Sequence, residues 1–507
     1  MIKDAEINMK EVELSELDPE KQPMTGDTQA AGGEKNGSVK LKVPEDEVIF
    51  TGLSKEELMK VAGTPGWVRI RWMLLVLFWL GWVGMLAGAI VIIVQAPRCK
   101  PIPEMNWWNE GPLYQIPDVE AFSGGMEGVA SKLDIINQLK VKGLVLGPLH
   151  TVQKNEPPTL ELDVIEPKQG PKEALLSLLQ KAHRKGISVV LDLTPNYNGS
   201  SVWFTDVDVI VEKVQAAAEY WLSLDVDGIK VSDLKVASGS PEWSKLQAAF
   251  QTNRTKDGKK RALMGVVEGI LADEVSQLAN SSGVDIILPD LLSTSNHGKE
   301  RIRAMDVLNS QQRGLGWGLG ATRRDQLSKQ AQSTALIRLY QLLLFTMPGT
   351  PVFTYGDEIG LNARQGSGYP KMVWDIETEG AVVNDTAETE RKERVEIRKW
   401  FTSLSDLRGK ERSLLHGDYY PLYSSATSLS FLRLWDQSER YVTAVNWGET
   451  PETITFTLTP TEGVELPETA KVRLSTNENL QAESTVNLDK ISLGPGQAVL
   501  LQFPYKP

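Results

Sequence analysis

The sequence predicts an α/β protein anchored in a membrane: one transmembrane helix, then a parallel β/α domain, then an antiparallel β domain. Three observations lead to this prediction. Residues 72–94 form an apolar run of 23 residues without a charge. From about residue 113, short apolar runs alternate with helix-like stretches over roughly 300 residues. After about residue 416, short alternating strands follow one another with turns between them.

The first segment, residues 1–71, is expected to be a cytosolic tail. Residues 1–50 are polar and mix acidic with basic side chains, so they bury too little apolar surface to fold alone. Ser54 and Glu57 fit a capping box, which predicts a short helix over 54–63 just before the membrane.

Residues 72–94 are expected to cross a membrane. As a helix with a rise of 1.5 Å per residue, they span a hydrocarbon core of about 30 Å with some tilt. A signal peptide would lie at the extreme N-terminus and would have a shorter apolar region. Gly81, Gly84 and Gly88 share one face of this helix. That face either packs closely against a second helix or reflects the general frequency of glycine in such spans.

Glycosylation sequons indicate which side of the membrane each part occupies. Basic residues flank the span on both sides, so charge gives only a weak bias. One Asn-X-Ser/Thr sequon, at Asn36, precedes the span, and four follow it, at Asn198, Asn253, Asn280 and Asn384. This distribution predicts a single-pass type II protein with a cytosolic N-terminus and a C-terminal ectodomain.

Cys99 is the only cysteine of the chain and lies in the predicted juxtamembrane neck, residues 95–112. The outside of the cell is oxidising, and a lone exported cysteine has no intrachain partner. It is therefore either an unused free thiol or half of an intermolecular disulfide. Cys99 follows Val94 by five residues, which reach at most ~18 Å. A partner thiol must then lie just above the same membrane, so the expected partner is another membrane protein.

Residues 113–415 show the alternation of a parallel β/α domain. Amphipathic stretches such as KEALLSLLQKAHRKG lie between apolar runs that are typical of buried parallel strands. A (β/α)8 barrel, the TIM-barrel architecture, fits the length. The strand-like runs lie at 113–116, 142–149, 187–193, 226–231 and 351–356.

Residues 416–507 are expected to form the antiparallel β domain, because stretches such as SLSFLRLW and RYVTAVNW are short, alternating and separated by turns.

The composition argues against some classes of partner. A net charge of −12 makes nucleic acid and anionic lipid surfaces poor partners. No metal site and no cofactor are expected, because the four histidines have no ligand spacing. They are His150, His183, His297 and His416.

Several stretches resemble the α-amylase family of glycoside hydrolases, over about residues 110 to 507. LYQIPDVEAF, ISVVLDLTPNY, LDVDGIKVSD and MPGTPVFTYGDEIGL stand in the order of that family. The resemblance implies a (β/α)8 barrel with a C-terminal antiparallel β-sandwich. It also implies a retaining mechanism, in which one carboxylate attacks the sugar and a second acts as acid and then as base.

The residues that this family uses for catalysis are replaced. Ser232 stands where the nucleophilic aspartate belongs, and Lys230 stands where an arginine belongs. A serine hydroxyl cannot replace a carboxylate nucleophile without a base to activate it. A valine takes the expected place of the acid, with Glu268 close by, and Tyr197 stands where the family usually has histidine. We therefore expect no catalytic residue and an inactive, glycoside-hydrolase-like ectodomain.

Two acidic residues of the family pattern remain, Asp192 and Asp357. They either serve catalysis or hold loops at the top of the barrel, and the missing nucleophile favours the second interpretation. A membrane-anchored α-glucosidase-like enzyme stays as one alternative, which Ser232 disfavours. A carbohydrate-binding or adhesion receptor that uses the old sugar cleft is another, and it requires exposed aromatic side chains in that cleft.

The whole chain resembles the heavy chain of heteromeric amino-acid transporters, of the cell-surface-antigen type. FTGLSKEELMKVAGTPGWVRIRW, APRC, VKGLVLGP and ERSLLHGDYY carry this resemblance. In that family the heavy chain, a plasma-membrane glycoprotein, pairs with a multi-pass light chain and is bonded to it by the juxtamembrane cysteine, here Cys99. The resemblance implies a heavy chain that stabilises its light chain and brings it to the plasma membrane through contacts of the cysteine, the span and the ectodomain. The family is also linked to integrins.

Overall fold

The computed structural model divides the chain into two compact units, Met1–Pro97 and Arg98–Pro507. The N-terminal unit carries a long apolar helix, and the C-terminal unit carries both β domains. The structure describes residues 54–95, 99–151, 156–197, 201–252, 255, 258–292, 297–319, 326–331, 333–361, 368–374, 385–459 and 464–506.

Two helices make up the described part of the N-terminal unit. α1 (Lys55–Ala62) begins at a capping box, in which Ser54 Oγ accepts the Glu57 backbone N–H at 3.4 Å and the Glu57 carboxylate accepts the Ser54 N–H at 3.2 Å. α2 (Pro65–Gln95) includes all of the predicted span 72–94. Its 31 residues are more than the about 20 that a helix needs to span a bilayer core. Within the described residues it is the one helix that is long and apolar enough to do so.

Eight parallel strands of the C-terminal unit form a barrel. Their order is β6-β5-β4-β3-β2-β1-β8-β7, so the strands from β1 to β6 pair in the order of the sequence. A parallel bridge between Ile287 and Leu315 joins the two edges and closes the barrel, which confirms the (β/α)8 fold class. The strands are β1 (Leu113–Ile116), β2 (Gly143–Leu146), β3 (Ser188–Asp192), β4 (Gly228–Val231), β5 (Ala262–Val267), β6 (Ile286–Pro289), β7 (Gly316–Trp317) and β8 (Thr350–Thr354).

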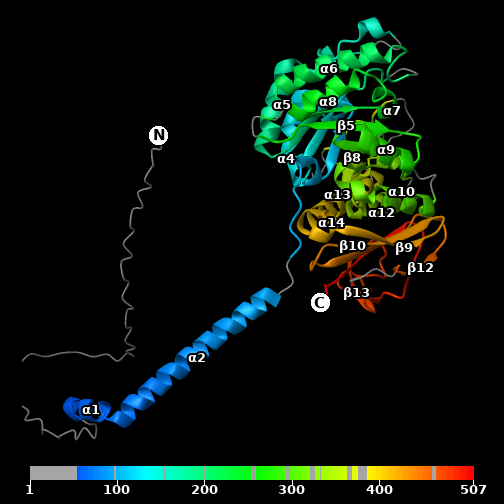
Figure 1. Ribbon diagram of the computed structural model, residues 1–507. Coiled ribbons are helices and arrows are strands. Elements are labelled where there is room, and N and C mark those ends of the chain that lie inside the picture. Colours follow the sequence, from blue (N-terminus) through cyan, green and yellow to red (C-terminus); the bar gives the residue numbers. More distant parts are fainter. Residues whose placement is uncertain are drawn as a thin grey trace, which may run out of the picture. The chain divides into compact units, whose positions relative to one another are not determined.

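Helices cover the outside of this barrel (Figure 1). In α5, Leu175, Leu178 and Ala182 lie on the buried face while Lys181 is exposed, because residues three and four apart share one side of a helix. The helices are α3 (Val119–Ser123), α4 (Met126–Gln138), α5 (Lys172–Arg184), α6 (Val207–Ser223), α7 (Leu234–Ala237), α8 (Trp243–Thr252), α9 (Ala272–Ser281), α10 (Gly298–Leu308), α11 (Leu327–Gln330), α12 (Thr334–Thr346), α13 (Asp385–Lys410) and α14 (Arg412–Leu415).

The C-terminal strands are antiparallel, as predicted, and form two layers. A six-stranded sheet has the order β14-β13-β16-β11-β10-β9, and β12 pairs with β15 in a second sheet. Leu432, Val442, Ile454 and Leu501 lie buried in the core that these sheets share. The strands are β9 (Asp418–Ser424), β10 (Ser428–Leu434), β11 (Arg440–Asn446), β12 (Glu452–Thr455), β13 (Thr469–Ser475), β14 (Thr485–Asn487), β15 (Lys490–Leu493) and β16 (Gln497–Phe503).

Two buried arginines bind carbonyl groups at the C-terminal end of α12, and one of them, Arg433, joins the sandwich to the barrel. Arg433, on β10, donates to the carbonyl oxygens of Thr346 and Gly417, both at 2.8 Å. Arg408, on α13, donates to the carbonyl of Met347 at 2.9 Å, and burial lowers the pKa of its guanidinium to about 10. Both side chains satisfy carbonyl groups that a helix end leaves without partners. The barrel and the sandwich are therefore linked by buried polar contacts as well as by apolar packing.

Candidate functional site

The carboxyl ends of the barrel strands bring together three buried polar side chains from β1, β3 and β4. Lys230 Nζ donates to Gln115 Oε1 at 2.7 Å and to Asp192 Oδ2 at 3.2 Å. The side chains of this ion pair are 1% and 0% exposed. The centre of the barrel is therefore occupied by a lysine ammonium whose charge is balanced by a buried carboxylate.

Ser232, one residue beyond β4, lies beside this pair. Asp192 Oδ1 accepts the Thr194 backbone N–H at 2.9 Å and also accepts the Thr194 hydroxyl. The Thr194 hydroxyl oxygen is 3.0 Å from Ser232 Oγ, and the Ser232 carbonyl accepts the indole N–H of Trp203 at 2.9 Å. The partner of the Ser232 hydroxyl is thus a second hydroxyl, which is no base, and a serine needs a base to become a nucleophile.

The two other sequence positions that differ from the amylase pattern serve packing. Tyr197 donates its hydroxyl to the His150 carbonyl at 2.9 Å, and the two rings meet edge to face at 5.5 Å. Val267 ends β5 and is buried, and Glu268 follows it as a half-buried side chain. Tyr197 therefore ties the loop after β3 to the loop after β2.

The carboxyl group of Asp357, beyond β8, holds backbone. Its two oxygens accept the N–H groups of Leu327, at 2.6 Å, and Thr354, at 2.8 Å. Burial raises the pKa of Asp357 well above its usual range. Its neighbour Glu358 accepts the Tyr114 hydroxyl and the Gly356 N–H, both at 2.8 Å, and burial also raises the pKa of both Glu358 and Tyr114. These carboxyls tie α11 and β1 to the end of β8.

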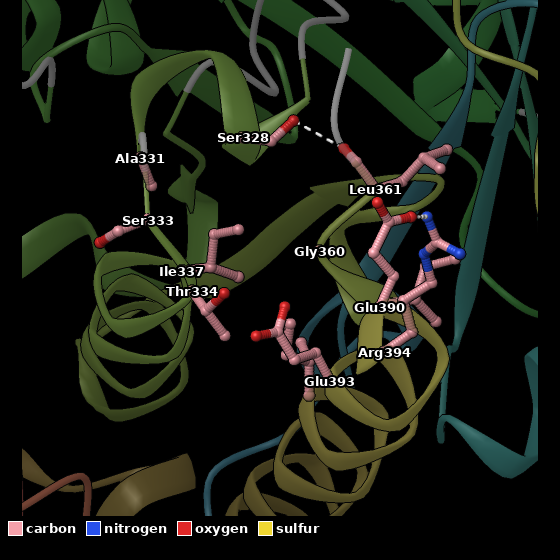
Figure 2. A pocket seen from close by; sticks show the side chains of 12 residues that line it. Ser328, Ala331, Ser333, Thr334, Ile337, Gly360, Leu361, Glu390, Glu393 and Arg394 are labelled. Carbon is pink, nitrogen blue, oxygen red and sulfur yellow. Dashed lines mark hydrogen bonds and ion pairs between the residues drawn. The ribbon is translucent and has the colours of Figure 1, made fainter. Parts of the chain in front are cut away.

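A separate cavity of about 500 Å³ lies between α12 and α13 (Figure 2). Its polar groups largely satisfy one another: Arg394 donates to Glu390 at 3.0 Å, and Ser328 donates to the Leu361 carbonyl at 2.7 Å. Ile337 and Thr334 line the opposite wall, from α12. The lining residues do not include Asp192, Lys230 or Ser232, so this cavity is distinct from the amylase-like centre.

Cys99 is exposed and belongs to the C-terminal unit. The next residue, Lys100, contacts the sandwich, with its ammonium 3.2 Å from Asp418 Oδ2 and its backbone N–H donating to Asp436 Oδ2 at 3.1 Å. Further along the neck, Trp107 is buried and donates its indole N–H to the Lys260 carbonyl at 3.0 Å. The neck therefore contacts the C-terminal unit at Lys100 and is buried in it at Trp107.

The remaining predicted sites are dispersed. Gly81, Gly84 and Gly88 lie exposed on α2, where an added Cβ would meet no atom within 4 Å. Asn280 is exposed in the last turn of α9. Three other sequon asparagines, Asn198, Asn253 and Asn384, lie outside the described residues. In the described part of the chain no group of three or more His, Cys, Asp or Glu side chains is placed to hold a metal ion.

Sequence reasoning missed Gln115, Thr194 and Lys100. A polar residue inside the buried run LYQI was a signal for Gln115, because such a side chain needs a polar partner inside the barrel. Lys100 carried no comparable signal, since its partners lie more than 300 residues away in the sequence.

Two family profiles match the chain. The family described as "Solute carrier family 3 member 2 N-terminus" matches residues 38–114, and "Alpha amylase, catalytic domain" matches residues 106–221. The mouse (Mus musculus) protein named amino acid transporter heavy chain SLC3A2 is 43% identical, over 100% of both chains. The rat (Rattus norvegicus) amino acid transporter heavy chain SLC3A1 is 21% identical, over 93% of this chain and 89% of the relative.

Solved structures share the fold at low sequence identity. An α-amylase from Geobacillus thermoleovorans with acarbose aligns with a TM-score of 0.56 at 18% identity, over 80% of this chain and all of the enzyme. The trehalose-6-phosphate hydrolase of Bacillus licheniformis aligns with a TM-score of 0.59 at 14% identity, over 79% of this chain and all of the enzyme. At this identity the likeness concerns the barrel and the sandwich alone.

Proposed function

This chain belongs to the SLC3A2 family of amino acid transporter heavy chains, and from that membership we propose that it is the non-catalytic heavy subunit of a heteromeric amino-acid transporter. It is joined by a disulfide at Cys99 to a multi-pass light chain, stabilises that chain and brings it to the plasma membrane. The light chain carries the amino acid, because one uncharged helix cannot line a polar path by itself.

The observation that carries the proposal is the position of the thiol. Cys99 is exposed, four residues beyond the end of α2 at Gln95 and one residue before Lys100, which contacts the sandwich. A thiol at this junction reaches only a partner that lies beside the same membrane. A multi-pass protein with a cysteine in an extracellular loop fits that requirement.

Formation of the bond requires an oxidant of the disulfide class. The two thiols lose two protons and two electrons to the oxidant's disulfide, which becomes two thiols while the interchain S–S bond forms. The oxidising secretory pathway supplies such disulfides. The exposure of Cys99 allows this exchange without unfolding of the C-terminal unit.

The amylase-like centre supports a subunit without glycosidase activity. Lys230 and Asp192 neutralise each other inside the barrel, and the Ser232 hydroxyl faces Thr194. A retaining glycosidase needs two carboxyl groups about 5 Å apart beside the sugar, one of them free to attack. The Asp357 carboxyl is engaged by two backbone N–H groups, which favours the loop-holding interpretation of that residue.

We propose a type II orientation at the plasma membrane, with residues 1–71 in the cytosol and α2 as the signal anchor. The exposed Asn280 supports glycosylation of the C-terminal unit, which would then be extracellular. The proposed boundaries are a span at 72–94, a neck at 95–112, a barrel at 113–415 and a sandwich at 416–507.

Purification of the full chain from cell membranes without reductant tests this proposal. We expect a covalent heterodimer on a non-reducing gel, and mass spectrometry of the Cys99 peptide should identify a multi-pass transporter as the attached protein. In Cys99→Ser the covalent band should disappear, while surface transport largely persists because the helix and the ectodomain still contact the light chain. A wild-type Cys99 that is free, or bonded only to small thiols, would refute the disulfide link.

A further inference from the structure

Lys100, in the neck, makes three contacts with the sandwich. Its backbone N–H donates to Asp436 Oδ2 at 3.1 Å, and its ammonium lies 3.2 Å from Asp418 Oδ2. The same Nζ lies 4.4 Å from the centre of the Trp435 ring. We call these four residues the Lys100 clamp. The clamp joins the neck to the start of β9 and to the turn after β10.

The sandwich side of the clamp is fixed by its own contacts. Trp435 is buried and donates its backbone N–H to Ser413 Oγ at 3.0 Å, and its carbonyl accepts the Ser438 N–H at 2.8 Å. Asp436 has φ of +45°, a left-handed conformation that a non-glycine residue keeps only where the surrounding structure holds it. The Trp435 ring that receives Lys100 is therefore held by contacts within the sandwich, and Asp436 follows it directly in the chain.

The neck has looser contacts on either side of Lys100. Cys99, Pro101 and Ile102 are exposed, and the next half-buried residue is Pro103, beside the crevice that Arg408 and His416 line. The clamp thus places the thiol one residue from its nearest anchor on the C-terminal unit. Without the clamp, four residues would separate the thiol from the anchor at Pro103.

We infer that Lys100 is a positioning residue for the interchain disulfide: it fixes the thiol of Cys99 at the β9–β10 edge of the sandwich, where the light-chain thiol must meet it. This inference rests on the proposed function. The effective concentration of two tethered thiols falls roughly as the −3/2 power of tether length. Lengthening this tether from one residue to four therefore lowers the effective concentration by up to about eightfold.

An exposed ion pair that only stabilised the fold would behave differently. Surface pairs contribute little to the free energy of unfolding. If the Lys100 pair did nothing else, its loss would leave the effective concentration of the two thiols unchanged. The decisive readout is therefore the effective concentration of the two thiols inside the assembled complex, rather than the stability of the subunit.

The test uses the full chain in complex with the light chain that mass spectrometry identifies on wild-type Cys99. The complex is purified in mild detergent, reduced, and equilibrated with defined mixtures of glutathione and its disulfide. Each interchain bond forms as two protein thiols and one glutathione disulfide give one protein disulfide and two glutathione thiols. The fraction of covalent heterodimer at each ratio gives the effective concentration.

One double variant opens the clamp, a second variant serves as the control, and a charge swap tests whether the ion pair can be rebuilt. Lys100→Met combined with Asp436→Gly removes the ammonium and the carboxylate that accepts the Lys100 backbone N–H, while glycine keeps the left-handed backbone. Lys471→Met removes another exposed lysine–carboxylate pair of the sandwich, with Glu483 at 4.0 Å, away from the neck. We expect the effective concentration to fall about three- to eightfold in the double variant and to stay unchanged in Lys471→Met. The charge swap Lys100→Asp with Asp418→Lys rebuilds the ion pair with its charges exchanged, so its effective concentration should stay close to that of the wild type.

Two outcomes contradict the inference in distinguishable ways. An unchanged effective concentration in the double variant, beside a normal wild-type disulfide, overturns the positioning role and leaves the proposed function standing. Absence of any interchain disulfide in the wild type overturns the proposed function and the inference with it.

Discussion

The mouth of the barrel and the neck differ in how far their charged side chains are buried. At the mouth, Lys230 and Asp192 are almost completely buried and neutralise each other. In the neck, Lys100 and Asp418 keep 49% and 44% of their side chains exposed, and the thiol beside them has no partner in the chain. The charged groups at the mouth are paired with each other, whereas the thiol in the neck is exposed to solvent.

This contrast concerns the positions at which an amylase-like barrel carries its catalytic groups. An amylase-like barrel presents free carboxylates at the carboxyl ends of its strands. Here the same positions hold groups that bond to one another or to backbone, so they stabilise the scaffold. Under the proposed function, the group that reacts is the exposed thiol of Cys99 in the neck.

Breaking the buried pair should have the largest effect. Lys230→Met removes the ammonium and leaves the Asp192 carboxylate buried without its partner, a change that typically costs about 3–5 kcal/mol. The measurement is the apparent free energy of unfolding of the full chain in mild detergent, followed by tryptophan fluorescence.

The matched neck variant sharpens this comparison. Lys100→Met breaks an exposed pair, for which a cost of less than about 1 kcal/mol is typical. Equal losses of stability in Lys230→Met and Lys100→Met would show that burial does not separate the two regions as we describe.

The sequence predicted the barrel well and its polar contacts poorly. The alternation of apolar runs and amphipathic stretches is a local property, so it predicts strands and helices wherever neighbouring residues decide the structure. The buried bond between Lys230 and Gln115 links positions 115 residues apart, and the clamp links Lys100 to positions 318 and 336 residues away. Such contacts depend on how the strands and sheets pack, which a single sequence does not state.

The glycine face of α2 extends the comparison to the membrane. Gly84→Leu together with Gly88→Leu would push a close helix away and remove its packing contacts. We expect co-purification of the light chain to fall by an order of magnitude when Cys99 is also replaced by serine. This corresponds to a loss of about 1.4 kcal/mol of helix-packing free energy, which is a factor of ten in affinity. Unchanged co-purification in mild detergent would mean that this face contacts lipid.

A pair of intermediate burial should give an intermediate, pH-dependent effect. His183 Nε2 lies 2.6 Å from Asp227 Oδ2, and this hydrogen bond raises the pKa of the imidazole above its ordinary value of 6.5. The stabilisation is fully present below the unfolded-state pKa of 6.5 and is lost as pH rises through the higher folded-state pKa. His183→Gln should therefore cost about 1 kcal/mol at pH 5.5 and less at pH 9. An equal cost at both pH values would contradict the charged pair.

Ser232→Asp should have the smallest effect, with no glycosidase activity gained. The new carboxylate would stand at the position of the family nucleophile, beside Thr194 and close to the Asp192–Lys230 pair. A retaining mechanism also needs a second carboxyl group that protonates the leaving oxygen, and β5 ends in the buried apolar Val267 where that acid is expected. Restoring one of two cooperating groups leaves the bond without an acid, so the pure C-terminal unit should release no 4-nitrophenol from 4-nitrophenyl α-glucoside. Turnover in this variant that disappears on further change of Glu268→Gln would identify Glu268 as a usable acid and would mean that the mouth is one substitution away from catalysis.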